Sequence, residues 1–545
     1  MKLKLIVSAV AFAALFFAVL LPPEAYPNGK MAVLLCATFP FFISMTERRI
    51  PAAFLRIGIC LFGLLFVHSF WISVDLYRSL DFITVVWTYY CLIGFFLYAG
   101  FDPLKPLALA MVTLSIIVSG YGLYQYIWGF DRLYSFVFYS GSDQIVKTPA
   151  LERIATRRVF STFALPGTLW GFLVVALPFH AALWRKNRLL TNAGLVGSAA
   201  ALIAAGFLTR SFGFLLGLLV LACAWLFLSH RRVIWNGLTA LLLLLVIAGG
   251  AFYSTRRGVI EGDNPAGLRL KNWISAWTIF ATHPLGTGAN TYGIVYPRYM
   301  LPGANETQYA HNTPLQLMSE FGFPVVLVGV AVVLIAVKRW KPDSLSRAPQ
   351  CVLLALAVWC VHNLVDINVY FPSVGVMGAV LIGVLLRKEL QIPAGPGRAA
   401  LVSVGLIGTL AIHFSGLAMM STELQHRAQV EYQEKKPAAA VATLNTARAL
   451  MPLNSSLFHD AGDILLDIHS KSRDPKDLEA AARSFRRAIR MSPMKVGPHI
   501  GLGLCLSWVN DLDGALKEVR TAEELYPDST YATSVARLLE ARKGN

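Results

Sequence analysis

Charged residues are scarce in this chain of 545 residues. Asp, Glu, Lys and Arg together make up only 14% of it, whereas 56% of the residues are hydrophobic. An ordinary soluble domain contains about 25% charged residues, so this composition excludes a soluble globular protein. The net charge of +17 would suggest a nucleic-acid binder in a soluble chain, so its meaning depends on where the basic residues lie along the sequence.

Cysteine and clustered carboxylates are also lacking. The seven cysteines form no Cys-x-x-Cys pair and do not group locally with histidine, which argues against a disulfide framework and against a zinc site. Four acidic residues of the stretch 254–320 are scattered, namely Glu261, Asp263, Glu306 and Glu320. We therefore expect chemistry that uses no bound metal and no cofactor.

Long apolar runs dominate the first 420 residues. A bilayer core of about 30 Å requires about 20 apolar residues per helix. Thirteen runs meet this condition, which predicts an all-α fold, a polytopic bundle of membrane helices. They lie near residues 3–21, 31–46, 53–71, 83–100, 107–128, 162–184, 192–208, 212–229, 233–253, 321–338, 350–366, 372–387 and 400–420. The first run lacks a small-x-small cleavage site before Pro22 and is interpreted as an anchor.

The loops predict the orientation. If the N-terminus is cytoplasmic, the cytoplasmic loops carry 18 basic and four acidic residues, while the short loops opposite hold only Lys30, Arg78 and Arg210. Residues 1–420 have a net charge of +16, so topology accounts for 18 − 4 = +14 of it and no nucleic acid is needed. An odd number of spans then places residues 421–545 in the periplasm of a Gram-negative cell.

The predicted domains follow from this topology. Residues 1–420 form a membrane domain of an inner-membrane, multi-pass protein, with a large periplasmic loop at 254–320, and residues 421–545 form a periplasmic helical domain. A motif recurs in this tail, as Leu444, Ala447 and Pro452, then Phe485, Ala488 and Pro493, then Val519, Ala522 and Pro527. It resembles tetratricopeptide (TPR) repeats, which build an α-solenoid. Such a tail would bind a peptide or protein partner, or would serve as a helical spacer or self-association module.

The loop at 254–320 holds most candidate functional residues. Asp263-Asn264-Pro265 predicts a helix start, and the apolar residues that follow, including Trp273 and Trp277, have helical spacing. Arg269 lies in the first turns of this helix, where an anion is favoured, although it could also reach lipid head groups. The segment Gly286-Thr287-Gly288 permits a tight turn but is a weak indication of a phosphate site, because it follows a helix and lacks a P-loop lysine.

Two further residues stand at predicted membrane boundaries. His311, followed by Asn312, precedes the span near 321–338, and an imidazole there can accept a proton from a hydroxyl near neutral pH. Arg210 lies between two spans with almost no loop, and a charge fixed at such a boundary is costly unless it is used. Together with Arg269 and Arg298, they favour an outward-facing site for an anionic, lipid-linked substrate.

These residues occur in motifs that resemble, in the same order, the O-antigen ligase/polymerase superfamily of membrane glycosyltransferases. The motifs are Thr209-Arg210-Ser211-Phe212-Gly213, Arg269-x-x-x-Trp273, His283-Pro284-Leu285-Gly286-Thr287-Gly288, His311-Asn312-Thr313-Pro314-Leu315-Gln316 and His362-Asn363-Leu364-Val365-Asp366. The resemblance covers roughly residues 30 to 390. It implies metal-independent, inverting transfer of a glycan from undecaprenyl diphosphate to an acceptor at the periplasmic face.

The resemblance also implies roles for single residues. Arg210 and Arg269 would bind the diphosphate, and His311 would deprotonate or orient the acceptor hydroxyl. We add Arg298 as a further diphosphate ligand, and Asp366 and Asn312 as supporting residues. Asp366 could orient a histidine or the acceptor, and a role at a helix end is an equal alternative.

Several alternatives stay open at this point. The acceptor can be lipid A core, another glycan repeat or a protein hydroxyl, which correspond to a ligase, a polymerase and a protein O-oligosaccharyltransferase. A transporter of lipid or polysaccharide is a different class, but the interiors of the predicted spans hold few ionisable residues beyond His68 and His180. A membrane-anchored scaffold without chemistry would need far fewer spans. The expected partners are therefore the lipid-linked donor, one of these acceptors and membrane lipid.

Overall fold

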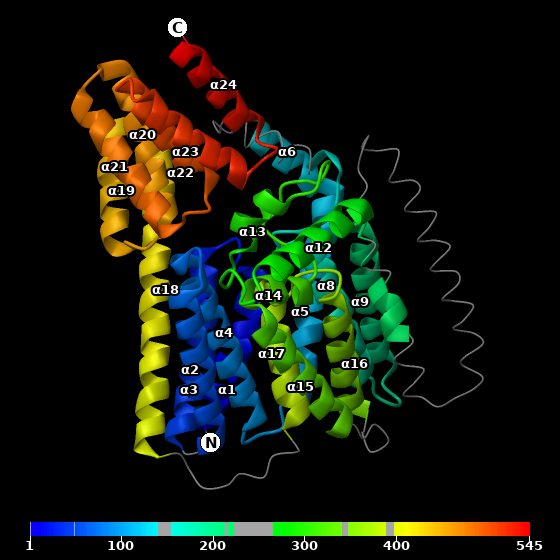
Figure 1. Cartoon of the computed structure of the whole chain (residues 1–545). Helices are drawn as coiled ribbons and strands as arrows, with labels where there is room; N and C mark the ends of the chain where they lie inside the picture. The colour runs from blue at the N-terminus through cyan, green and yellow to red at the C-terminus, as the bar shows by residue number, and fades with distance from the viewer. Residues whose placement is uncertain are drawn as a thin grey trace. The chain divides into compact units, whose positions relative to one another are not determined.

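The computed structural model describes residues 2–47, 49–139, 154–211, 213, 216–222, 265–339, 347–387 and 397–544. Within these residues all regular structure is helical and no strand occurs (Figure 1), which confirms the expectation of an all-α fold. The predicted span near 233–253 lies outside the described residues, as do most of the span near 212–229 and the acidic residues Glu261 and Asp263.

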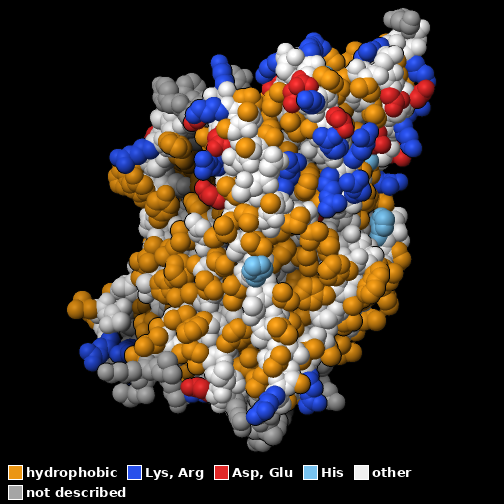
Figure 2. Space-filling model, turned by 90° about the vertical axis from the view of Figure 1, so that its left-hand side faces the viewer, with side chains coloured by type: hydrophobic (Ala, Val, Ile, Leu, Met, Phe, Trp, Pro, Cys, Tyr) orange, Lys and Arg blue, Asp and Glu red, His pale blue; other side chains and the backbone are white. Residues whose placement is uncertain are grey.

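Six described helices are long and apolar enough to cross a membrane. They include α2 (Pro27–Thr46), α3 (Ala52–Trp71), α4 (Leu76–Leu97), α9 (Leu189–Leu208) and α18 (Arg398–Gln433), and the sixth stretch contains α5 (Leu104–Tyr124). Hydrophobic side chains cover much of the face that Figure 2 shows. On α3, the large side chains of Leu64, Phe70 and Trp71 are exposed. The chain is therefore a membrane protein, and the total of thirteen spans stays a prediction.

Shorter apolar helices follow five other predicted runs. They are α1 (Lys2–Leu20), α8 (Pro166–Ala182), α15 (Phe323–Arg339), α16 (Arg347–His362) and α17 (Pro372–Leu386). Proline stands in the first turn of α2, α8 and α17. Its fixed φ suits a helix start, and the N–H that it lacks would have no partner within the helix at that position. The sequence therefore specifies where these helices begin.

The chain forms two compact units. The first unit comprises residues 1–59, 85–265 and 335–408, and the second unit comprises residues 60–84, 266–334 and 409–545. In the first unit, α1 packs on α2 and α17, and α8 packs on α16. Aromatic rings fill part of this core, where Phe54 stacks on Tyr90 with ring centroids 4.7 Å apart.

The second unit combines the loop region after residue 265 with the tail. Its loop elements are α12 (Pro265–Thr282), α13 (Tyr292–Val295), the short 3-10 helix η2 (Tyr296–Tyr299) and α14 (Thr313–Phe321). The tail elements are α19 (Pro437–Leu450), α20 (Ser455–Ser472), α21 (Pro475–Met491), α22 (Val496–Trp508), α23 (Leu512–Leu525) and α24 (Thr530–Gly544). The boundary at residue 420 that the sequence predicts between two domains stays a prediction.

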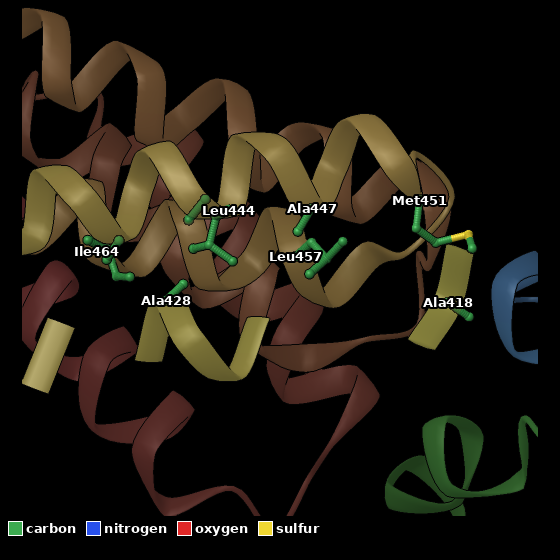
Figure 3. Packing of buried hydrophobic residues seen from close by; sticks show 9 residues of the cluster. Ala418, Ala428, Leu444, Ala447, Met451, Leu457 and Ile464 are labelled. Carbon is green, nitrogen blue, oxygen red and sulfur yellow. The ribbon is translucent and has the colours of Figure 1, made fainter. Parts of the chain in front are cut away.

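The repeated tail motif occupies equivalent places in successive helices. Its first two positions lie in α19, α21 and α23, and all six side chains are buried, namely Leu444, Ala447, Phe485, Ala488, Val519 and Ala522. Figure 3 shows the first cluster, in which Leu444 and Ala447 pack with Leu457 and Ile464 of α20. Each motif proline follows the end of its helix. The pattern thus marks three helical hairpins, and their assignment as TPR repeats stays a prediction.

Glycine allows a close approach at the centre of the tail. The ring of Phe485 on α21 lies against Gly462 of α20 and Gly501 of α22. A Cβ atom added at Gly462 would lie 2.6 Å from this ring, and one at Gly501 would lie 2.4 Å from it. Both glycines are therefore required by the ring that fills the space between the two helices.

We predict that Gly501→Ala destabilises the tail. The added methyl group overlaps with the Phe485 ring, and overpacking of this kind costs about 1–3 kcal/mol. Thermal unfolding of the full-length protein, followed by limited proteolysis of the tail, measures the effect. Gly329→Ala in α15 is the matched control, since no atom lies within 4 Å of its added Cβ. Equal unfolding midpoints for the two variants would show that the ring does not set this spacing.

Candidate functional site

The loop after residue 265 has its own hydrophobic core. Ala276 and Ile279 of α12 pack with Tyr292, Val295 and Tyr296, and all five are buried. The two tyrosines hydrogen-bond to one asparagine of α12: Tyr296 Oη donates to Asn272 Oδ1 at 2.7 Å, and Tyr292 Oη donates to the Asn272 carbonyl at 3.1 Å. The loop region is therefore a folded element that can hold side chains in fixed positions.

Glu320 of α14 ties this element together. Its carboxylate is fully buried and accepts hydrogen bonds from the backbone N–H groups of Asn290 (2.6 Å) and Tyr292 (3.2 Å) and from Gln316 Nε2 (3.1 Å). Its backbone carbonyl accepts from the N–H groups of Thr287 and Gly288. One residue thus fixes the path of the segment 287–292.

The glycine-rich segment is used for packing. Gly286 has a φ of +88°, and a Cβ there would lie 2.1 Å from the Glu320 carbonyl oxygen. Gly322, with a φ of +67°, comes equally close to the Pro284 carbonyl. The connection between α3 and α4 holds the same segment, since the Val74 N–H donates to the Thr287 carbonyl at 2.9 Å. These contacts explain the glycines without a bound phosphate.

His311 stands at the junction of an extended loop and α14. Its φ of 53° is in the left-handed region, which is unfavourable for a residue with a side chain. Trp273 Nε1 of α12 donates a hydrogen bond to the His311 carbonyl at 3.2 Å. Asn312 caps α14, because its Oδ1 accepts from the Leu315 N–H at 3.0 Å. The backbone at His311 is therefore fixed from both sides.

Arg269 is related to His311 through Trp273 of α12. It precedes Trp273 by one helical turn, so the two residues share a face of the helix. Lys271 is directed elsewhere, since its Nζ donates to the Pro302 carbonyl at 2.8 Å. Of the two basic residues in this part of α12, Arg269 is the one on the face that holds His311.

Arg298 is exposed on η2, where its positive charge acts on His283, the residue that follows α12. Burial, together with the charge of Arg298, lowers the pKa of His283, and its Nε2 lies 3.1 Å from Tyr299 Oη. That Arg269 and Arg298 bind the same diphosphate stays a prediction.

Arg210 belongs to the first unit. It follows the end of α9, and its backbone N–H donates to the Phe207 carbonyl at 3.0 Å. Arg158 Nε donates to the carbonyl of the preceding residue, Thr209, at 3.1 Å. Like His311, Arg210 has a left-handed backbone, with a φ of 48°. Backbone strain of this kind persists only where the surroundings enforce it, and it concentrates at functional sites.

Asp366 is also in the first unit and lies beside a histidine. Its Oδ2 is 3.4 Å from His362 Nε2, and its Oδ1 accepts from the Ile367 N–H at 3.0 Å. Asn368 Nδ2 lies 2.8 Å from His362 Nδ1, and the Trp170 ring centroid is 3.6 Å from that of His362. Both His362 and Asp366 are buried. The imidazole is thus held on several sides, with the carboxylate on one of them.

Contacts between the loop region and the tail were not foreseen from the sequence. Tyr526 Oη, after α23, donates to Glu306 Oε1 at 2.7 Å, and Met494 packs on the cluster that contains Tyr296. Ser455 Oγ of α20 donates to Asp75 Oδ2 at 3.3 Å. Single-sequence patterns carry no signal for such pairs, because the partners are hundreds of residues apart. In the second unit, the tail is therefore in contact with the elements that carry Arg298 and His311.

Metal ligands are not grouped in the part of the chain that the structure describes. Among these residues, no three or more His, Cys, Asp and Glu side chains come together in a way that could hold a metal ion. Glu320, the buried carboxylate of the loop region, accepts hydrogen bonds from N–H donors.

We predict that Glu320→Ala disrupts the loop region. Its removal leaves two backbone N–H groups and the Gln316 amide without their acceptor, at a cost of about 3 kcal/mol. The midpoint of thermal unfolding in detergent should fall by roughly 5–10 °C. Glu524→Ala, which removes an exposed carboxylate of α23, should leave the midpoint unchanged. If the two variants unfold at the same temperature, Glu320 does not hold the loop together.

Comparison with known proteins places these residues in a family. No curated protein matches the chain. Residues 197–330 match the family model described as O-antigen ligase. The matched segment begins within α9, ends within α15 and contains Arg210, Arg269, Arg298 and His311. This segment is therefore similar to the O-antigen ligase family, which supports the resemblance that the motifs indicate.

Proposed function

We propose that the chain transfers a glycan from undecaprenyl diphosphate to an acceptor hydroxyl at the periplasmic face of the bacterial inner membrane. The family in general implies a ligase-type activity on a lipid-linked glycan and an acceptor. The proposed topology has a cytoplasmic N-terminus and a periplasmic tail. The proposed reaction uses no metal and inverts the anomeric centre.

One observation carries this proposal. Trp273 of α12 holds the backbone of His311 in its left-handed conformation, and Arg269 lies one turn away on the same face of α12. The base and the permanent cation of the proposal thus belong to neighbouring elements of the loop region. This is the combination that attack by a hydroxyl on a glycosyl diphosphate requires.

The proposed reaction is a single displacement. His311 accepts the proton of the acceptor hydroxyl while the acceptor oxygen forms a bond to the anomeric carbon. The bond from this carbon to the diphosphate oxygen breaks, and the electron pair leaves with undecaprenyl diphosphate. Arg210 and Arg269 stabilise the additional negative charge, because a guanidinium stays protonated and can donate two parallel hydrogen bonds to phosphate oxygens.

Arg298, Asn312 and Asp366 have supporting roles in the proposal. Arg298 is exposed on η2, where it can contact a phosphate or glycan group farther from the reacting bond. Asn312 holds the start of α14 and so positions His311. The separation of 3.4 Å between Asp366 and His362 supports the orientation of a histidine by Asp366.

We predict that His311→Ala and Arg210→Ala each abolish product formation in a correctly inserted protein. Loss of a general base reduces a rate by about 10²–10⁴-fold. Arg269→Lys should also reduce the rate, since an ammonium group cannot form the paired hydrogen bonds. Surface polysaccharide in a complemented deletion strain is the readout. His426→Ala and Arg537→Ala, at exposed positions of α18 and α24, are the controls. Normal polysaccharide with His311→Ala would refute the proposed base.

The acceptor is predicted to be lipid A core, as in a ligase. A gel of lipopolysaccharide from the deletion strain should then show intact core and no ladder. A band of core with one repeat would instead identify a polymerase. Loss of glycoprotein with a normal ladder would identify a protein O-oligosaccharyltransferase. If proteoliposomes take up labelled lipid-linked glycan but do not transfer the glycan to an acceptor, the protein is a transporter and not a glycosyltransferase.

A further inference from the structure

Helix α21 has one strongly basic face. Arg483, Arg486, Arg487 and Arg490 follow the spacing i, i+3, i+4 and i+7, so they share one side of the helix, and all four are exposed. Phe485 and other buried residues form the opposite side. Lys and Arg side chains also gather in a patch on the face of the molecule that Figure 2 shows.

The arginines have little counter-charge. Within the described chain, Arg483 forms an ion pair with Glu479. Arg486, Arg487 and Arg490 then form a positively charged group. A further guanidinium comes from α19. Arg448 donates to Ser484 Oγ of α21 at 3.2 Å and lies 5.1 Å from the Phe458 ring centroid.

Arg487 lies over the same aromatic ring, 6.0 Å from its centroid. Two guanidinium groups from different helices thus meet at Phe458 of α20. Like charges in such proximity repel each other unless an anion neutralises them. We call the residues Arg448, Arg486, Arg487 and Arg490, with Phe458, the arginine face.

The start of α20 lies beside the ends of helices that are apolar enough to cross a membrane. Leu457 packs in one cluster with Ala418, which belongs to the apolar run 400–420 of α18 (Figure 3). Ser455 hydrogen-bonds to Asp75, which lies in the short connection between α3 and α4, two helices that are apolar enough to cross a membrane. Two independent contacts therefore place residues 455–458 beside the ends of membrane helices.

The end of α21 lies beside the start of α20. Helices α20 and α21 form a hairpin, so the last turns of α21 lie beside the first turns of α20. Lys495, just after α21, donates from Nζ to Ser456 Oγ at 2.8 Å. Arg487 and Arg490 are therefore at the membrane end of the tail, together with Arg448 in the last turn of α19.

We propose that the arginine face binds the phosphate groups of anionic phospholipids in the leaflet from which α18 emerges. Arginine is suited to phosphate because its planar group donates two hydrogen bonds, and an aromatic ring between guanidinium groups is suited to the head-group region. Each basic residue near an anionic bilayer strengthens binding by roughly fivefold. The position of the face beside the span ends favours lipid over a soluble polyanion. This lipid contact would hold the tail against the membrane.

The experiment uses the full-length protein in nanodiscs. One set contains phosphatidylcholine alone, and the other contains phosphatidylcholine with phosphatidylglycerol. A trace of the respective lipid carries a photoreactive head group, and mass spectrometry maps the lipid adducts after illumination. The variant R486Q/R487Q/R490Q is compared with K517Q/R537Q/R542Q, which removes the same charge from α23 and α24. Thermal unfolding of both variants monitors folding.

The expected result is adducts at residues 448–458 and 483–495 with phosphatidylglycerol and few with phosphatidylcholine. They should fall at least fivefold in the α21 variant and stay unchanged in the control. Equal labelling by the two lipids, or labelling that the α21 variant retains, would overturn the proposal. A third result would also overturn it: no lipid adducts form, and the acidic polysaccharide polygalacturonate binds to the phosphatidylcholine discs through the arginines. The arginine face would then be a glycan site. Polysaccharide transfer is not the readout, so this test is separate from that of the proposed function.

Discussion

The hydrogen bonds of Glu320 organise the loop region. A buried carboxylate is costly unless its oxygens are satisfied, and here N–H groups from the 290–292 segment and from α14 itself satisfy them. The bonds close the turn that contains Gly286 and Gly288 and fix α14 against α13. Because α14 begins at Thr313, two residues after His311, the position of the candidate base depends on a residue that takes no part in the proposed chemistry. The same bonds leave this carboxylate occupied, so a metal ion would have to displace them.

A second constraint is the contact of the tail with the loop region and with the connection between α3 and α4. The pairs Tyr526 with Glu306 and Ser455 with Asp75 connect elements that are far apart in the chain. Burial and the neighbouring Glu306 raise the pKa of Tyr526 to about 12, which keeps the phenol protonated as a donor. The tail is therefore part of the same compact unit as α12 and α14. A tail that only captured a distant partner would not need these contacts.

Much of the fold could be predicted from the sequence, because it depends on local features. Apolar runs identified the membrane helices, prolines marked the starts of α2, α8 and α17, and Asn312 before Thr313-Pro314 has the pattern of a helix cap. The repeated Leu/Phe/Val and Ala positions of the tail also proved to be buried in equivalent helices. The spatial relation of the candidate residues could not be predicted in this way. The partners of Glu320 and Asp75 are set by tertiary packing, which no local pattern indicates.

The helix α18 has a mechanical consequence. It continues for 36 residues, from Arg398 to Gln433, without an internal proline, so at about 1.5 Å per residue it is a rod of about 54 Å. In the second unit, Ala418 and Ala428 of this helix both pack in the cluster with Leu444 and Leu457. One additional residue between the two alanines would turn the helix beyond it by about 100° and would move one of them out of the cluster. The number of residues between them is therefore fixed by the packing of the tail.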